Sequence, residues 1–253
     1  MRRRFFLDKF DGASATLHGE TAEHLGRVLR AEPGQLYELS DGQRVWLGRI
    51  ERVALSKRGD SRVEFALLEP VAAIEPALEI QLLISLVKFD RFEWCLEKAT
   101  ELGAASIVPL AASRTDKPLL AAAEKRHARW ERILLESAQQ SRRLRPPTIA
   151  ALITPEQAFA AAFAGAFTET GAACKILLSE RQHAPSMHEA LAGAAGTRNA
   201  ALAIGPEGGW TDEEIVQARA AGFVEASLGD NILRTETAVL AALAVIRFAA
   251  EAP

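Results

Sequence analysis

The chain has 253 residues, of which 49% are apolar and 25% are charged, and its formal net charge is −3 at pH 7. This composition is typical of a soluble globular protein with a full core, and the length allows one large domain or two ordinary ones. Because no apolar run approaches the roughly 20 residues that cross a bilayer, we exclude a membrane protein.

The first residues, MRRRFF, continue into acidic, polar sequence and lack the apolar stretch of a signal peptide. Farther along, Cys95 and Cys174 lie in separate apolar segments, and neither has metal-ligand spacing around it. We therefore expect a cytoplasmic protein with buried free thiols and without a metal site.

Residues 1–70 are predicted to form short strands and one helix. The predicted strands, which are apolar or alternating, are Arg4–Leu7, Gln35–Leu39, Arg44–Val53 and Arg62–Leu68. Asp41-Gly42 is typical of a hairpin turn. The predicted helix is Thr21–Leu29, with Leu25, Val28 and Leu29 on one face. This pattern predicts a small β-barrel domain, and Pro70–Pro76 is predicted to be a linker because proline cannot continue a ladder.

After the linker, strands and helices alternate. The predicted strands are Ile80–Leu86, Ser106–Leu110, Lys175–Leu178, Ala200–Ile204 and Phe223–Leu228. The predicted helices are Arg91–Leu102, Glu124–Ser141, Pro155–Phe163, Met187–Ala192, Asp212–Ala221 and Glu236–Ala250. Capping boxes at Ser186/Glu189 and Thr211/Glu214 mark helix starts, and Gly103 and Gly222 mark helix ends. Buried strands between helices predict an α/β domain with a mostly parallel sheet.

Positive charge is concentrated in residues 114–145, which contain nine Lys and Arg against four Asp and Glu. Such a segment can bind phosphate, because the release of counterions depends on the surface that docks and not on the total charge. A solvated helix face is the alternative interpretation.

A glycine-rich loop, IGPEGGWTDEEI, spans residues 204–215 and follows a predicted strand. Gly205, Gly208 and Gly209 lie where ligands bind in parallel sheets, beyond the carboxyl ends of the strands. Neither a P-loop nor a dinucleotide fingerprint is present, and Glu207 would repel a pyrophosphate but not a cation. A tight turn without a ligand is the alternative.

A second glycine turn, LGDNILRTETA, spans residues 228–238 and precedes the last helix. Two loops that leave neighbouring strands would form a slot lined by backbone donors and acceptors. Such a slot could hold an adenine-bearing, positively charged ligand. The helix Glu236–Ala250 is apolar nearly all round, which predicts deep burial.

The two loops together resemble those of the RsmE family of ribosomal RNA methyltransferases, in the SPOUT superfamily. The resemblance extends to HLGRVLR (24–30) and EKATELGAASIVPL (97–110), and so covers nearly the whole chain in the family's order. It implies a PUA-like, RNA-binding β-barrel over residues 1–70 and a SPOUT α/β domain with a C-terminal trefoil knot over residues 71–253.

The resemblance also implies an activity and partners. The family consists of homodimeric enzymes that use S-adenosyl-L-methionine to methylate N3 of one uridine in small-subunit (16S) ribosomal RNA. The implied cofactor-binding residues are Leu202, Ile204, Gly205, Pro206, Glu207, Gly208, Gly209, Leu228, Gly229, Asn231, Ile232, Leu233, Arg234, Thr237 and Ala238.

Arginines are the first candidates for catalysis, because permanently charged guanidinium groups can stabilise the uridine anion that forms when N3 loses its proton. We expect this role of Arg143, and also consider Arg114 and Arg234; phosphate binding is the alternative for Arg143. Glu236 is the candidate base, although its position is also ordinary for a helix start. Relatives commonly have Glu-Gln-Ser/Cys-Gly-Arg where this chain has Gln139-Gln140-Ser141-Arg142-Arg143, so a catalytic carboxylate at 139 is in doubt.

Basic residues in both parts of the chain are expected to bind RNA and to recognise the folded shape of the ribosomal RNA. The target base is expected to swing out of its stack to reach the slot. The candidates are Arg2, Arg3, Arg4, His24, Arg27, Arg30, Lys88, Arg142 and Arg145. Two other interpretations stay open. One is a SPOUT methyltransferase that acts on tRNA or on a ribose 2′-hydroxyl, and the other is a non-catalytic, RNA-binding ribosome assembly factor.

Overall fold

The chain divides into two compact units in a computed structural model that describes residues 3–56, 60–163, 173–181, 183–192 and 196–250. The first unit is Met1–Glu75 with Ala138–Pro146, and the second is Pro76–Ser137 with Pro147–Pro253. The division therefore lies beyond residue 70, and a short later segment returns to the first unit.

The first unit is built on a five-stranded sheet with the order β1-β3-β4-β5-β2. Its strands are β1 (Arg4–Phe6), β2 (Ser14–His18), β3 (Leu36–Ser40), β4 (Val45–Ala54) and β5 (Arg62–Val71). Neighbours are antiparallel except β1 and β3, which are parallel. The sequence analysis missed β2, whose alternation rests on Ala15 and Leu17 alone. The core of this unit includes Phe5, Ile50 and Phe65.

The helical segment of the first unit corrects one prediction. Helix α1 spans Gly19–Glu23 and continues as a π-helical turn, His24–Val28. Leu25 is fully buried, as expected, but Val28 is 65% exposed. A π-helical turn contains more residues than an α-helical turn, so it rotates Val28 away from the face of Leu25.

The predicted linker begins too early, because Pro70 still belongs to β5 and lies opposite Trp46 of β4. Strand β2 pairs with β5 no farther than Ala66. Among the described residues, the second edge of β5 has no strand partner beside Pro70, and a missing N–H on that edge costs no ladder hydrogen bond.

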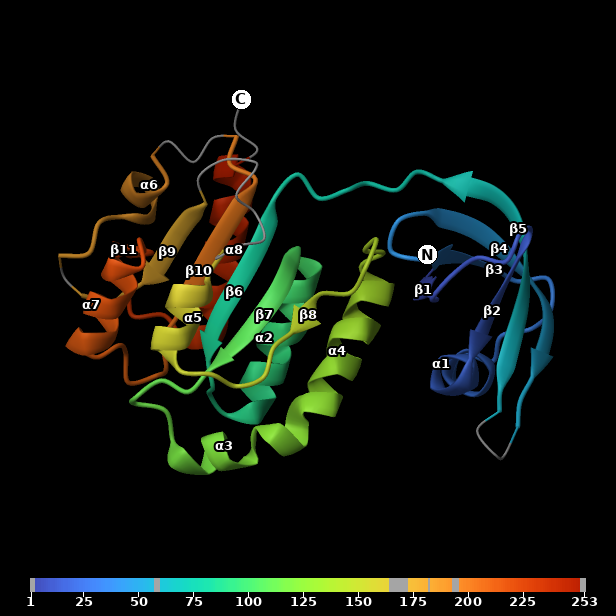
Figure 1. The fold of residues 1–253 in the computed structure, drawn as a ribbon, viewed down its shortest axis with the longest axis horizontal. Coiled ribbons are helices and arrows are strands. Elements are labelled where there is room, and N and C mark those ends of the chain that lie inside the picture. The colour runs from blue at the N-terminus through green and yellow to red at the C-terminus, as the bar shows by residue number, and fades with distance from the viewer. Residues whose placement is uncertain (1–2, 57–59, 164–172, 182, 193–195, 251–253) are drawn as a thin grey trace. The chain divides into compact units, whose positions relative to one another are not determined.

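The second unit is an α/β structure around a parallel six-stranded sheet with the order β11-β9-β10-β6-β7-β8 (Figure 1). The strands are β6 (Glu79–Ser85), β7 (Ala104–Leu110), β8 (Thr148–Ile149), β9 (Cys174–Leu178), β10 (Asn199–Ile204) and β11 (Val224–Ala226). The helices are α2 (Phe89–Glu101), α3 (Lys117–Ala122), α4 (His127–Gln140), α5 (Pro155–Ala161), α6 (Met187–Ala190), α7 (Asp212–Ala220) and α8 (Thr235–Ala250). The predicted parallel sheet is confirmed, whereas α3 and the two-residue β8 were missed.

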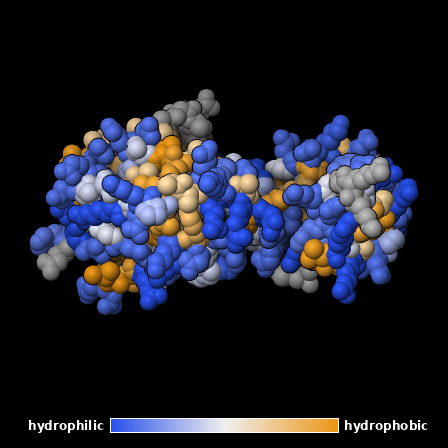
Figure 2. Space-filling view, turned by 90° about the horizontal axis from the view of Figure 1, so that it is seen from below, coloured by the Kyte–Doolittle hydropathy of each residue, from blue (hydrophilic) through white to orange (hydrophobic). Residues whose placement is uncertain are grey.

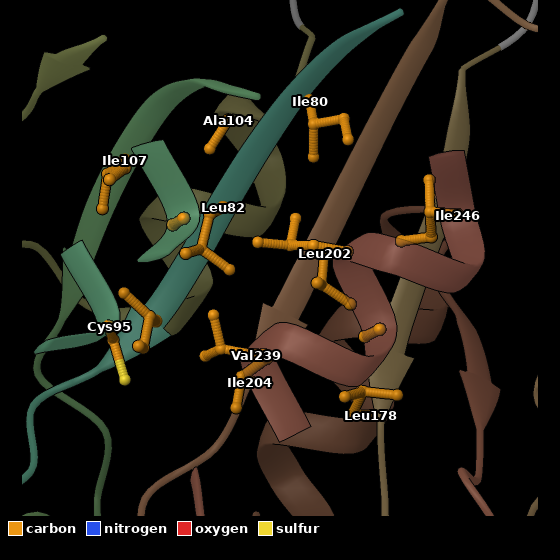
Figure 3. Close-up of a cluster of buried hydrophobic side chains, with 14 of the residues drawn as sticks. Ile80, Leu82, Cys95, Ala104, Ile107, Leu178, Leu202, Ile204, Val239 and Ile246 are labelled. Atoms are coloured by element: carbon orange, nitrogen blue, oxygen red, sulfur yellow. The ribbon is translucent and has the colours of Figure 1, made fainter. Parts of the chain in front are cut away.

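Alternating residues of the central strands build a separate core on each face of this sheet. On one face Leu82 and Leu202 pack with Val239 and Ile246 of α8, as Figure 3 shows. On the other face Leu83 and Ala203 pack with residues of α5 and α7. Because successive side chains point to opposite faces and both faces are covered, neighbouring residues of β6 and β10 such as Leu82 and Leu83, or Leu202 and Ala203, are both apolar and buried.

The predicted helix boundaries follow from local chemistry. Both capping boxes form, with Ser186 accepting from the amide of Glu189 and Thr211 accepting from the amide of Glu214. Gly103 and Gly222 follow α2 and α7 with φ values of +92° and +85°, which favour glycine. Among the described residues no helix has both the length and the apolarity needed to cross a membrane.

Helix α8 is less buried than predicted. Val239, Leu243 and Ile246 are buried, but Val245 is 37% and Phe248 is 79% exposed. The sheet and α2 cover one face of the helix, while the apolar residues of the other face remain at the surface of the chain. In the view of Figure 2 the surface is mainly hydrophilic, with apolar side chains gathered in separate patches.

Candidate functional site

A cavity of about 590 Å³ lies at the carboxyl ends of β9, β10 and β11, within the second unit. Most of its lining comes from three segments at the ends of these strands: Leu178–Arg181, Ile204–Asp212 and Ser227–Ala238. Parallel neighbours bring these strand ends to one edge of the sheet. The volume is in the range of small-molecule sites.

An indole ring forms part of the apolar lining of the cavity. The Nε1–H of Trp210 donates to the carbonyl of Leu178 at 2.9 Å, and the ring meets Phe159 edge-on with 5.8 Å between centroids. Gly205 lies against the same ring, and a Cβ on this glycine would come within 3.0 Å of it. The bare backbone at 205 therefore allows Trp210 to pack beneath the loop.

Close contacts or backbone conformation also explain why glycine occupies positions 208 and 209. Gly209 has a φ of +71°, and a Cβ there would lie 3.1 Å from Oε1 of Glu180. A Cβ on Gly208 would lie 3.2 Å from Cβ of Arg114. Arg114 in turn donates from Nη1 to the carbonyl of Gly208 at 2.8 Å. This arginine thus holds the glycine-rich loop from the side of β7.

The buried carboxylate of Glu214 connects the start of α7 to the segment that follows β7. Glu214, in the first turn of α7, accepts from the amide of Thr211 at 2.9 Å and from the amide of Ser113 at 2.8 Å. Asp212, two residues earlier in the same helical turn, lines the cavity and pairs with Arg181 at 2.8 Å. The start of α7 is therefore fixed to the residues after β7 and after β9.

A further arginine lies between the two glycine loops. Arg91, in the first turn of α2, pairs with Glu207 and approaches Glu236 to 4.0 Å between Nε and Oε1. Arg91 and Glu207 line the cavity. Oε2 of Glu236 is buried and has no hydrogen-bond partner among the residues that the structure describes.

Most of the residues proposed from the sequence for this site line the one cavity. Those that line it are Ile204, Gly205, Pro206, Glu207, Gly209, Leu228, Gly229, Asn231, Ile232, Leu233, Arg234, Ala238 and Arg114. Gly208 contacts Arg114 instead, Glu236 contacts Arg91, and Leu202 belongs to the core beneath; Thr237 is exposed.

The sequence analysis missed several residues of the lining. They include Arg91, Ser179, Glu180, Arg181, Trp210 and Asp212. Ser179–Arg181 follow the predicted strand Lys175–Leu178, so the rule that ligands bind beyond strand ends could have found them. Arg91 comes from a helix start more than a hundred residues away from Glu207, and nothing in the local sequence indicates their contact.

In the first unit, the buried carboxylate of Glu38 pairs with two of the arginines proposed for RNA binding, the buried Arg4 and the exposed Arg142. Arg4, whose side chain is 7% exposed, donates from Nη2 to Oε2 of Glu38 at 2.8 Å, and Arg142 pairs with the same carboxylate. Burial alone would raise the pKa of Glu38, but hydrogen bonds from Arg142 and Arg4 and their charges lower it below its usual value. We call Arg4, Glu38 and Arg142 the Glu38 triad.

The segment 138–146 makes further contacts within this unit. Ser40 donates from its hydroxyl to the carbonyl of Leu144 at 2.6 Å, and Arg145 pairs with Glu75 at 3.2 Å. Arg142 has a φ of +57°, and the amide of Arg143 donates to the carbonyl of Ala138 at 3.0 Å, an arrangement typical of a helix end. Arg143 thus belongs to the unit of β3 and β4, and not to the one that contains the cavity.

The other proposed RNA-binding residues are placed as follows. Arg3, Arg30 and Lys88 are exposed, and Arg27 donates to the carbonyl of Ser56 at 3.1 Å. Nε2 of His24 is buried without a hydrogen-bond partner among the described residues. Arg2 lies outside the described residues.

The cavity suits a small ligand that combines a flat ring with charged groups. Leu178, Ile204 and Trp210 offer apolar surface, while the two loops offer main-chain polar groups. Arginines and carboxylates both occur in the lining, so the cavity does not have the excess of positive charge expected of a polyphosphate site.

Residues 74–247 match the model of a family described as an RNA methyltransferase domain. The chain is 37% identical over 235 residues to the ribosomal RNA small subunit methyltransferase E of Synechocystis sp., an alignment that covers 92% of this chain and 73% of the relative. It is 28% identical over 245 residues to the Bacillus subtilis protein of the same name, which covers 93% of this chain and 90% of that relative.

Solved structures agree with these relatives over the whole chain. A ribosomal RNA small subunit methyltransferase E from Neisseria gonorrhoeae, bound to S-adenosylmethionine, superposes with a TM-score of 0.82 at 29% identity. The match covers 99% of this chain and 98% of that one. A structure from Legionella pneumophila, also with bound S-adenosylmethionine, gives a TM-score of 0.81 at 29% identity.

Proposed function

Because the chain belongs to the RNA methyltransferase family, we propose that it transfers a methyl group from S-adenosylmethionine to N3 of a uridine in 16S ribosomal RNA. One observation carries this proposal: the two glycine loops meet in a single cavity in a chain that is similar throughout to structures with bound S-adenosylmethionine. The relatives named for the small ribosomal subunit support this RNA as the substrate.

The residues of the cavity fit the proposed cofactor. Gly205 and Gly209 let the loop pack closely against Trp210 and Glu180, which keeps the loop in the conformation that lines the cavity. Apolar surface from Leu178, Ile204 and Trp210 suits an adenine ring, and the loop Leu228–Arg234 would bind its polar edge through main-chain groups. S-adenosylmethionine supplies a methyl group that its sulfonium already activates.

The protein's own task is then to orient uridine and to help N3 lose its proton. Arg114 and Arg234 line the cavity and could stabilise the negative charge that develops on O2 and O4. Arg114 already donates to Gly208, so it also fixes the loop. Glu236 carries an unpartnered buried oxygen among the described residues and is the candidate acceptor of the proton.

We also propose from the sequence that Arg143, which belongs to the first unit and does not line the cavity, stabilises the uridine anion. We expect Arg143→Ala to lower the single-turnover rate at saturating RNA about 100-fold, as the loss of one charge-stabilising donor does elsewhere. The dissociation constant for RNA should change little. Arg132→Ala, which removes a 69% exposed arginine from α4, is the matched control and should keep the rate. A normal rate with weaker RNA binding would assign Arg143 to phosphate contact instead.

The glycine-rich loop gives a second prediction about the cofactor. Gly209→Ala places a Cβ at a φ of +71°, which costs roughly 1–2 kcal/mol and shifts the loop away from the conformation that forms the cavity. We expect S-adenosylmethionine to bind about tenfold more weakly by titration calorimetry. Gly222→Ala imposes similar strain at a φ of +85° outside the cavity lining, so it should lower the stability and leave the affinity unchanged. Equal affinity losses in both variants would contradict this explanation.

The first unit is proposed to be a PUA-like module that docks the RNA. Arg3 and Arg30 are exposed, and Arg27 and Arg145 keep about half of their side-chain surface exposed. Lys88, in the second unit, is exposed as well. Phosphate contacts from such residues would position a folded RNA, while the target base swings out of its stack to reach the cavity.

We also propose the family's trefoil knot and homodimer for this chain. The chain reaches β11 at the edge of the sheet and then returns as α8 to pack against β10 and α2, which supports a threaded C-terminal segment. The apolar surface of α8 at Val245 and Phe248 supports association with a second copy. Light scattering on the purified protein measures the oligomeric state.

Mass spectrometry of nucleosides from 16S ribosomal RNA, with and without the gene, tests the proposed function. Loss of one N3-methyluridine in the deletion strain is the expected result. Loss of a methylated nucleoside from tRNA, or of a ribose 2′-O-methyl group, would instead assign the enzyme another target. An assembly factor without catalysis would fail to bind S-adenosylmethionine in calorimetry.

A further inference from the structure

One arginine and two carboxylates form a charged cluster beside the cavity, which we call the Arg91 cluster: Arg91, Glu207 and Glu236. Arg91 contacts one carboxylate from each glycine loop region, because Glu207 belongs to the loop after β10 and Glu236 to the first turn of α8. A single guanidinium therefore holds two walls of the site. The formal charge of the cluster is negative.

The remaining charges of the lining cancel. Three arginines (Arg114, Arg181, Arg234) face three carboxylates (Glu180, Asp212, Asp230). Arg181 and Asp212 are paired directly at 2.8 Å. Within the lining Arg91 and Glu207 cancel as well, so the net negative charge of the Arg91 cluster comes from Glu236, which lies beside the lining.

The charge of Glu236 acts in a weakly screened environment. Its side chain is 18% exposed, and its Oε2 is buried without a partner among the described residues. Cys95, one helical turn after Arg91, is fully buried, and burial followed by the charge of Glu236 raises the pKa of its thiol to about 12. The thiol stays neutral at physiological pH. The field of a carboxylate in such surroundings extends farther than it would in water.

We propose that Arg91 is a positioning residue for Glu207 and Glu236, and that the Arg91 cluster makes the cavity select S-adenosylmethionine over S-adenosylhomocysteine. These two molecules differ by the methyl group and by the positive charge of the sulfonium. Transfer of the methyl group removes that charge, so the cluster favours binding before the reaction and release after it. This inference rests on the proposed function for the identity of the cofactor alone.

Titration calorimetry with both molecules tests the inference through the ratio of their two dissociation constants. Glu207→Gln neutralises the cluster, and we expect it to lower the preference for S-adenosylmethionine about threefold to tenfold. Arg91→Gln leaves two carboxylates without their cation. Both molecules should then bind more weakly, because the loop loses its anchor, but the preference for S-adenosylmethionine should rise by a similar factor. Arg91→Lys should keep the preference of the natural protein.

A matched control separates charge from general disturbance. Glu213→Gln makes the same change of charge at an exposed position of α7 outside the lining and should leave the ratio unchanged. If Glu207→Gln and Arg91→Gln weaken both molecules equally, the cluster is only a structural support and the inference is wrong. Failure of the natural protein to bind either molecule would contradict the proposed function instead.

Discussion

Trp210→Ala is expected to bind S-adenosylmethionine about 30- to 100-fold more weakly and to lose about 3–5 kcal/mol of stability. The indole is 7% exposed, lies under Gly205 and contacts Phe159, so its removal leaves a void between the loop and α5. The glycine-rich loop then loses the ring against which Gly205 packs. Calorimetry for the affinity and urea unfolding for the stability measure the two effects.

Two variants control for this substitution. Trp94→Ala removes the same side chain from a position of α2 that is 40% exposed and outside the lining, and should change the affinity little. Trp210→Phe keeps an aromatic ring but leaves the carbonyl of Leu178 without its donor, which should cost about 1–3 kcal/mol of stability. Equal affinities in Trp210→Ala and the natural protein would show that the ring does not support the cofactor site.

The second large effect is expected at the Glu38 triad. Glu38→Gln removes the buried carboxylate and leaves Arg4 charged in a setting where its side chain is 7% exposed, which should destabilise the first unit by about 3–5 kcal/mol. Glu75→Gln is the control. The side chain of Glu75 is 60% exposed, so its ion pair with Arg145 should contribute less than about 1 kcal/mol to stability. Hydrogen exchange of the β3 and β4 amides reports on this unit separately.

The pH dependence of this effect has a definite sign. The two arginines lower the pKa of Glu38 in the folded state, so its contribution to stability is complete above the pKa of an unfolded glutamate. It disappears as the pH falls through the lowered, folded-state pKa. The difference in stability between the natural protein and Glu38→Gln should therefore begin to shrink as the pH falls below about 4.3, the pKa of an unfolded glutamate, and vanish only below the folded-state pKa of Glu38. A constant difference down to lower pH would mean that the carboxylate is not the source of the stabilisation.

Local chemistry made much of this fold predictable. The capping boxes at Ser186 and Thr211 and the glycines at 103 and 222 act within a few residues of sequence, and the structure contains all of them. The two glycine loops follow apolar strands of a parallel sheet, and the sheet brings such strand ends together. For these reasons the cavity could be predicted before its walls were known.

Contacts between distant residues could not be predicted in the same way. Arg91 meets Glu207 across 116 positions of sequence, and Arg142 meets Glu38 across 104. Likewise, nothing in the local sequence showed that Arg4 and Arg142, both predicted to bind RNA, pair with the buried carboxylate of Glu38. The prediction that α8 is deeply buried is wrong at Phe248, because apolar composition does not show whether the same chain covers both faces of a helix.

The return of residues 138–146 to the first unit affects how this protein can be divided in the laboratory and in evolution. The backbone passes between the units three times, so a single cut at residue 75 releases no complete module. A fragment ending there would lack Arg142 and the carbonyl of Leu144, the partners of Glu38 and Ser40. Gene fusion or domain exchange at one junction would carry the same defect, so we expect the two units to be inherited as an inseparable pair.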